Sequence, residues 1–390
     1  MMLVSIIVVA IISVAFYRVL KLKHMENWLL PYIISILKRP NVKETKHVLF
    51  CFVDHYEPQW RNDDIEVERA RVDRWCKDYR EMAKQHQDAD GVMPQHSFFY
   101  PEEEYRYEHL AKLSAMCHEG FGEIEIHLHH HDDTKENFIK TITDFAHTLH
   151  HKHGALPVDP HTGEIKYAFI HGNWALDNSR ADGMYCGIDN EIKALADTGC
   201  YVDMTLPSSP SDTQTSTVNS IYYATGKDGQ CKSHDKGVEV EVGKPQQGEL
   251  MLIQGPIGIN YKWRNAKGIP HIENADVRKK VPPIKSRIDH WVKSHIHVKG
   301  RPEWIFIKVH THGTQEEDMD TLLGQPRHDM HSYLEEKYND GTNYVLHYVS
   351  AREMYNIAKA AEAGKSGNPN QYRDFYFAKP TFKPLTPESV

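Results

Sequence analysis

We expect an α/β fold with a barrel-like (β/α) arrangement, and three observations predict it. From residue 46 onward, short apolar runs alternate with longer segments of helical periodicity. Alternating strands and helices require crossover connections, which are typical of a mainly parallel sheet. About seven or eight such repeats fit within roughly 310 residues, a length at which (β/α) barrels form one domain.

The individual elements follow from local patterns. Helix 63–86 has apolar residues at helical spacing, including Ile65, Val72 and Trp75, and helix 102–120 ends in a glycine. Further helices are predicted at 133–154, near 188–197 and at 351–364. The predicted strands are 47–54, 96–100, 123–128, 167–173, 201–208, 249–257, 303–313 and 343–350.

The N-terminus is different in kind. Residues 1–22 contain no charged side chain before Arg18, and the apolar run is long enough to cross a bilayer. Its positive charges follow the run, so we predict an uncleaved, single-pass transmembrane helix rather than a signal peptide, which remains an alternative. The positive-inside rule would place the rest of the chain in the cytoplasm, with a periplasmic location as the alternative.

Three further segments complete the predicted organisation. Residues 23–45 form a juxtamembrane segment whose apolar run either lies at the membrane interface or packs on the main domain. Residues 46–364 form the barrel, and residues 365–390 form a tail over its surface. The net charge of -8 and the absence of a basic stripe argue against nucleic acid as a partner.

Polar residues follow the apolar runs repeatedly, as in "FVDHYEP", "EIHLHHHDD", "FIHGNWALDNS" and "IKVHTHG". The carboxyl ends of parallel strands share one face, where the active sites of (β/α) folds form. We therefore expect one mouth lined by Asp54, His55, Glu57, His127, His129, His131, His171, Asp203, His310 and His312.

The spacing of the histidines suggests a metal site. His127 and His129 point the same way on a strand, and His131 continues the series or approaches His127 across a turn. Two imidazoles with one carboxylate suit zinc or a similar divalent ion, and Asp54 is the natural carboxylate. His310 or His312 would then act as general acid, with His55 or Glu57 as the base.

The loop after the fourth strand is a candidate substrate-binding segment, with His171, Asn173, Trp174 and Asp177 close together. Trp174 would either stack on a sugar face or cap the barrel. Asp203, after the fifth strand, would either pair with a catalytic residue or cap a turn.

These motifs, in this order, resemble the polysaccharide deacetylase superfamily, which has the NodB-homology fold and includes carbohydrate esterase family four. "CFVDH" resembles its Thr-Phe-Asp-Asp-Gly motif, and "EIEIHLHHH" resembles the strand that leads into a His-x-x-x-His or His-x-His metal pair. "HSFFY", between these two, resembles the Thr-Phe-Phe strand that follows the first motif. "FIHGN" lies where the third motif would be, and "VHTHG" resembles the final histidine motif, so the likeness covers about residues 46 to 350.

The resemblance implies a distorted seven-stranded (β/α) barrel and metal-dependent removal of an N- or O-acetyl group from a saccharide in envelope polysaccharide metabolism. The family's Asp-Asp pair falls on Val53-Asp54 or on Asp54-His55, so Asp54 is either the metal ligand or the base. His171 replaces the arginine of the third motif. Two alternatives stay open: hydrolysis of a non-glycan amide, and a non-catalytic, metal-bound glycan-binding or assembly protein.

Overall fold

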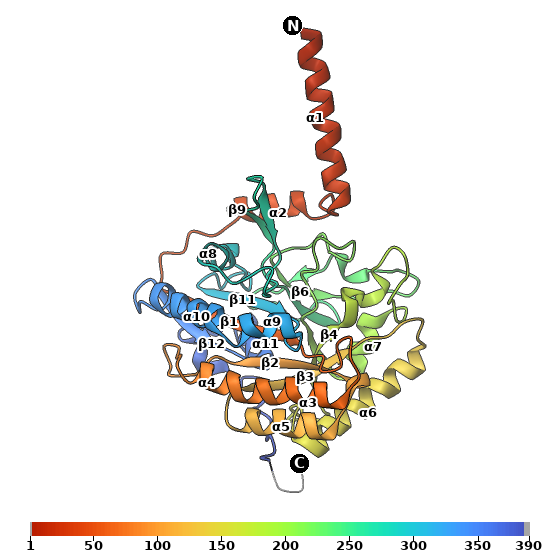
Figure 1. The fold of residues 1–390 in the computed structure, drawn as a ribbon, viewed down its shortest axis with the longest axis vertical. Coiled ribbons are helices and arrows are strands. Elements are labelled where there is room, and N and C mark those ends of the chain that lie inside the picture. The colour runs from red at the N-terminus through yellow and green to blue at the C-terminus, as the bar shows by residue number, and fades with distance from the viewer. Residues whose placement is uncertain (1, 386–390) are drawn as a thin grey trace.

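The chain folds around one curled, mostly parallel sheet (Figure 1). The computed structural model describes residues 2–385, apart from the side chains of residues 2–4 and 6–12. The ten strands of the sheet are β1 (Lys46–His55), β2 (His96–Pro101), β3 (Gly122–Leu128), β4 (Tyr167–His171), β5 (Cys200–Asp203), β6 (Ile221–Ala224), β7 (Val238–Glu239), β8 (Leu250–Ile253), β11 (Trp304–Thr311) and β12 (Tyr344–Tyr348). They lie in the order β11-β1-β2-β3-β4-β5-β8-β6-β7, and β12 pairs with the first half of β1.

The mixed α/β architecture is confirmed, but the predicted distorted seven-stranded barrel is wrong. The sheet has ten strands, and β6 pairs antiparallel with both β7 and β8. Within residues 2–385, the ladder of paired strands ends at β11, so it does not close into a ring. The outer edge of β11 is occupied by a loop instead: the His310 amide donates to the Ala275 carbonyl (3.0 Å), and the Val277 amide donates to the His310 carbonyl (2.8 Å).

The helices that surround and fill the sheet are α3 (Ile65–Arg74), α4 (Arg80–Ala83), α5 (Tyr107–His118), α6 (Lys135–His153), α7 (Glu191–Asp197), α8 (Lys285–Ser294), α9 (Glu316–Leu322), α10 (Gln325–Tyr338) and α11 (Ala351–Glu362). A π-helical turn, Trp75–Tyr79, joins α3 to α4. A separate hairpin is formed by β9 (Gly258–Arg264) and β10 (Pro270–Glu273). Short 3-10 turns include Gly172–Trp174 and Leu176–Asn178 in the loop after β4.

Two hydrophobic cores lie on opposite faces of the sheet because successive strand residues alternate. The outer core joins Val48, Phe50 and Phe52 of β1 to the helices α3, α5, α6, α7, α8 and α10. The inner core joins Leu49, Cys51 and Val53 to α11. Helix α11 is buried along nearly all of its length, between the inner face of the sheet and the C-terminal tail.

The N-terminal segment corrects the predicted membrane topology. Helix α1 (Met2–Leu22) projects away from the sheet (Figure 1). Among the residues searched, namely those that the structure describes, no helix is both long enough and apolar enough to span a bilayer. That finding overturns the single-pass anchor predicted for residues 1–22, and with it the predicted membrane location. The side chains of residues 1–4 and 6–12, which carry much of that apolar run, lie outside the described part.

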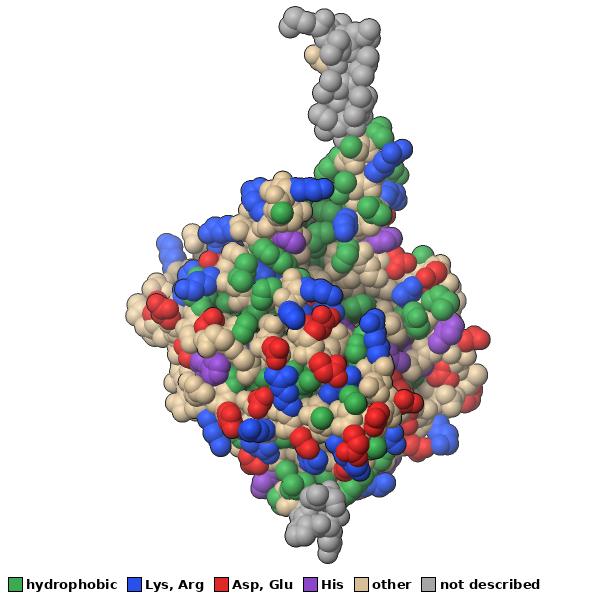
Figure 2. Space-filling view, in the orientation of Figure 1, with side chains coloured by type: hydrophobic (Ala, Val, Ile, Leu, Met, Phe, Trp, Pro, Cys, Tyr) green, Lys and Arg blue, Asp and Glu red, His purple; other side chains and the backbone are tan. Residues whose placement is uncertain are grey.

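The segment 23–45 packs on the main domain through α2 (Leu29–Leu37). Trp28 and Tyr32 are buried against Val218 and Ile257. At the other end of the chain, the tail lies along the domain, with Phe377 in the inner core and Phe382 in the outer core. On the face shown in Figure 2, acidic and basic side chains are interspersed.

The docking of α2 predicts a sensitivity to acid. The rings of Tyr32 and His290 meet over Gly258, whose missing Cβ would lie 2.6 Å from both. Burial lowers the pKa of His290 to about 4, although Glu273 opposes the shift. The contribution of His290 to stability is therefore complete above pH 6.5 and lost as the pH falls through about 4. Between these values we expect the wild type to lose about 1–3 kcal/mol more than His290→Gln in urea unfolding.

The matched control for this experiment is His161→Gln, since His161 is exposed. As the pH falls, this variant should lose as much stability as the wild type does. Parallel pH profiles for wild type and His290→Gln would contradict the prediction.

Candidate functional site

The end of β1 divides the predicted site residues between two faces. Leu49, Cys51 and Val53 lie in the inner core, so His55 continues the inward-facing row. Asp54 continues the outward-facing row with Phe52. The alternation of the strand therefore places the side chains of Asp54 and His55 on opposite faces.

Asp54 accordingly does not join the histidines, in contrast to its prediction as metal ligand and catalytic residue. Its carboxyl group is fully buried, lies 2.9 Å from His96 Nε2 and accepts a 2.6 Å hydrogen bond from the Gly313 amide. Burial raises the pKa of Asp54 to about 7, although the bond from Gly313 opposes the shift. Asp54 thus links the loop after β11 to β2 on the outer face of the sheet.

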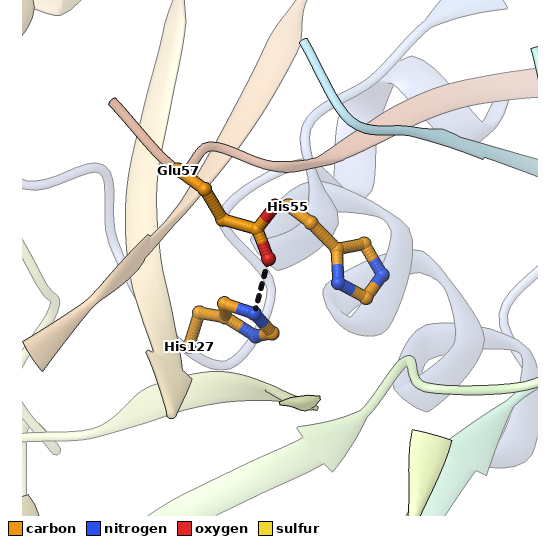
Figure 3. Close-up of side chains that lie close together, drawn as sticks. All are labelled: His55, Glu57 and His127. Carbon is orange, nitrogen blue, oxygen red and sulfur yellow. Dashed lines mark ion pairs between the residues drawn. The ribbon is translucent and has the colours of Figure 1, made fainter. Parts of the chain in front are cut away.

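Inside the mouth, His55, Glu57 and His127 converge from the ends of β1 and β3 (Figure 3). One ligand atom from each lies within 4.8 Å of the other two. Glu57 Oε1 is 3.5 Å from His127 Nε2 and 3.1 Å from His129 Nε2, while Oε2 is 3.3 Å from His312 Nδ1. We call these five residues the mouth group.

His127 is oriented as a metal-ligating histidine would be. Its Nδ1 lies 2.7 Å from the carbonyl oxygen of Ile170 on β4, so this nitrogen carries the ring proton and donates a hydrogen bond to that oxygen. Its Nε2 is buried and makes no hydrogen bond; with the proton on Nδ1, Nε2 presents a lone pair to the mouth, where Glu57 Oε1 lies 3.5 Å away (dashed line in Figure 3). Metal-binding histidines are held in this way by a backbone carbonyl behind the ring, so the residues present fit a divalent ion.

The electrostatics of the mouth group separate neutral from charged members. Burial opposes the ionised form of Glu57, yet contacts with His127, His129 and His312 hold its pKa well below the usual value. Burial lowers the pKa of both His55 and His127. The rings of His55 and His127 are therefore neutral, which is the form that binds metal.

His129 and His312 are the charged members of the group. Burial lowers the pKa of each, but carboxylates reverse the effect: Glu103 and Glu57 raise that of His129 to about 10, and Glu57 raises that of His312. His129 Nδ1 lies 2.5 Å from Glu103 Oε1, at the rim. With its side chain 29% exposed, His129 marks the side from which solvent reaches the group.

Two tryptophans flank this opening. The ring of Trp174 lies 5.9 Å from His312 and 6.1 Å from His55, and the ring of Trp60 lies 6.1 Å from His312. Both are partly exposed. Asn173 and Trp174 have positive φ angles of 54° and 56°, which turn the chain sharply after β4 and bring the indole over the mouth.

Other predicted residues lie elsewhere. His131 is exposed, and its Nδ1 accepts a hydrogen bond from the Tyr185 amide. His310 faces inward with its ring 6.4 Å from that of His55. It does not belong to the convergent set, by which we mean the three residues His55, Glu57 and His127. Thus neither His131 nor Asp54 occupies the metal position predicted for it.

Three predicted substrate-binding residues support the chain around the mouth. Asp203 accepts hydrogen bonds from the amide and hydroxyl of Thr205, whose hydroxyl oxygen accepts from the His171 amide. Asp177 accepts from the amides of Glu191 and Ser233. His171, Asp177 and Asp203 are buried in these contacts, so of the predicted set only Asn173 and Trp174 lie at a partly exposed position.

The residues that sequence patterns missed come from loops. Asp276 and Arg278 act electrostatically on His312, and Glu103 pairs with His129. Asp276 lies in the irregular segment that borders β11, so no periodicity points to it. The three acidic residues of "EEE" directly after β2 were a usable signal for Glu103, since they follow a strand as the other site residues do.

Comparison with known proteins adds no relative. No protein-family model matches the sequence, and no curated protein resembles it closely enough to count as a match. The resemblance to polysaccharide deacetylases therefore stays a prediction from the motifs.

Proposed function

We propose that the chain is a metal-dependent hydrolase that removes an acetyl group from an N- or O-acetylated saccharide. The observation that carries the proposal is the buried, unpartnered Nε2 of His127, which faces His55 and Glu57 at the carboxyl ends of the strands. Two neutral imidazoles and one carboxylate form a zinc-type donor set that leaves a coordination position open. A divalent ion bound there supplies Lewis acidity toward an acyl carbonyl and water.

The remaining members of the mouth group suit the proton transfers of this reaction. Water adds to the acetyl carbonyl carbon, the C–N or C–O bond to the sugar breaks, and the leaving atom takes up a proton. Glu57 raises the pKa of His312, which favours the protonated ring, so His312 is the candidate general acid. Trp60 and Trp174, beside His312, offer aromatic faces on which a sugar ring stacks.

The test is metal analysis of the full chain together with acetate release from a panel of N- and O-acetylated oligosaccharides. We expect His127→Ala to lose the metal of the mouth group and all acetate release. Asp54→Asn should retain the metal, because Asp54 faces the outer layer. His161→Ala, at an exposed loop position, is the matched control and should behave as the wild type.

Circular dichroism establishes that each variant is folded, and His55→Asn replaces His127→Ala if the latter does not fold. Unchanged metal content in both folded mouth variants would refute the proposal. Saccharide binding without acetate release, whatever divalent metal is supplied, would instead support the non-catalytic alternative.

A further inference from the structure

A second group of histidines and a carboxylate lies behind the mouth, on the outer face of the sheet. It consists of His130, just after β3, His171 at the end of β4, and Glu191 at the start of α7. The neighbours of His130 and His171 belong to the outer core: the His130 ring packs 5.2 Å from Phe138, and the His171 ring lies 6.2 Å from Phe169. This outer group is therefore separated from the mouth group by the sheet itself.

The three ligand atoms lie at the spacing of a metal's coordination sphere. His130 Nε2 is 2.9 Å from His171 Nε2 and 3.2 Å from Glu191 Oε1, and His171 Nε2 is 3.4 Å from the same oxygen. Ligands of a tetrahedral zinc ion, at bond lengths of about 2.0–2.1 Å, lie about 3.3–3.4 Å from one another. One face of such a tetrahedron is thus nearly formed.

The other nitrogen of each ring is already hydrogen bonded. His171 Nδ1 lies 2.5 Å from the carbonyl of Gly172, and His130 Nδ1 lies 3.2 Å from Asp133 Oδ2. With these Nδ1 atoms protonated and both rings neutral, the two Nε2 atoms would direct lone pairs at one another; a cation between them or a second proton on His130 relieves that repulsion. Acceptors behind the rings are the outer contacts that metal-binding histidines use.

The outer group is enclosed and held from several sides. His171 and Glu191 are fully buried, and the His130 side chain is 6% exposed. The second carboxylate oxygen of Glu191 accepts from the Asp177 amide at 2.7 Å. Gly187 packs so closely that a Cβ there would lie 2.0–2.5 Å from the His130 ring atoms.

A third buried histidine lies within electrostatic range of the group. His234 is fully buried, and neither of its ring nitrogens has a hydrogen-bond partner among the described residues. Glu191 and His171 both interact electrostatically with this ring. A buried imidazole without a partner is costly.

We infer that His130, His171 and Glu191 bind a divalent transition-metal ion, zinc by their donor set, which ties the ends of β3 and β4 to α7. The ion has a structural role, since the group is closed to solvent and faces away from the mouth. The loop 172–190, which carries Asn173 and Trp174 to the mouth, is anchored at both ends by this ion. The inference does not depend on the proposed hydrolase activity.

The test counts zinc ions in the full chain after dialysis against metal-free buffer, and uses Co²⁺ as a spectroscopic replacement. If both sites bind, we expect about two ions in the wild type, one in His127→Ala, one in His171→Gln and none in the double variant. If only the outer group binds, wild type and His127→Ala both hold one and His171→Gln none. Failure of the mouth proposal is thus distinguished from failure of this one.

In the His127→Ala background, which lacks the mouth site, a chelator should lower the unfolding temperature, whereas it should not lower that of the folded double variant His127→Ala/His171→Gln. The double variant should also lose the visible absorption of tetrahedral Co²⁺ that His127→Ala retains. If His171→Gln does not fold, Asp133→Asn replaces the carboxylate behind His130, whose other oxygen accepts from Thr134 and Asn137, and should weaken zinc affinity about 10–100-fold in chelator competition. If folded His171→Gln has the zinc content and the Co²⁺ spectrum of the wild type, the inference is overturned. That result would mean that a protonated His130, paired with Asp133 and Glu191, fills the group instead.

Discussion

Glu57→Gln is expected to weaken metal binding at the mouth more than about 100-fold and to abolish acetate release, since loss of a contact behind a ligand alone typically costs 10–100-fold. Glu57 is the one carboxylate in the convergent set, and it also contacts His129 and His312. A neutral amide of the same shape keeps the packing but removes the charge. Chelator competition on the purified full chain measures the affinity.

The same substitution should change the protonation of the mouth group. Without the Glu57 charge, the pKa of His312 falls toward that of a buried, unpaired imidazole, whereas His129 keeps its partner Glu103. NMR titration of the histidine rings in metal-free protein measures the pKa values of His312 and His129 separately. Glu103→Gln is the control: Glu103 is exposed and contacts His129 at its backbone amide and its outer ring nitrogen, away from Glu57, so metal affinity should be retained. Unaltered metal affinity in Glu57→Gln would remove the basis for a mouth metal site.

Arg352→Met is expected to lower the free energy of unfolding by about 3–5 kcal/mol, measured by urea denaturation. Arg352, on the buried helix α11, donates two hydrogen bonds of 2.8 and 2.9 Å to the carboxylate of Glu123 on β3. It also donates to the carbonyl of Phe377 in the tail. Methionine fills similar space but leaves the Glu123 carboxylate buried without its counter-charge.

The double variant Glu123→Gln/Arg352→Met should recover part of this loss, because neither charge then remains uncompensated. Arg69→Met is the matched control, since Arg69 forms its bidentate contact with Glu108 at the surface and should change stability little. If Arg352→Met and Arg69→Met have equal stability, the buried pair does not hold α11 in the sheet.

Local patterns located the parallel strands well. Each of the eight predicted strands overlaps a strand of the structure, because apolar runs bounded by polar residues are visible without tertiary information. The same is true of α3, α5, α6, α7 and α11. Helices α8, α9 and α10, and the strands β6, β7, β9 and β10, were not predicted from the sequence. Helix α8 does bury Ile288, Trp291 and Val292 at helical spacing, so its pattern was visible in the sequence. The short strands β6, β7 and β10 have only two to four residues, too few for a period to mark them.

The sequence by itself determined which residues end the parallel strands, and hence that His55, Glu57, His127, His129 and His312 would lie near one another. Tertiary structure decided how they are sorted. The register of β1 turned Asp54 toward His96 and left Glu57, beyond the strand, as the carboxylate of the mouth. The tertiary structure also placed His130 and His171 on the outer face, next to a glutamate at the start of α7. Chain order cannot specify such groupings, because the face of a side chain depends on where each strand ends and on what packs against it.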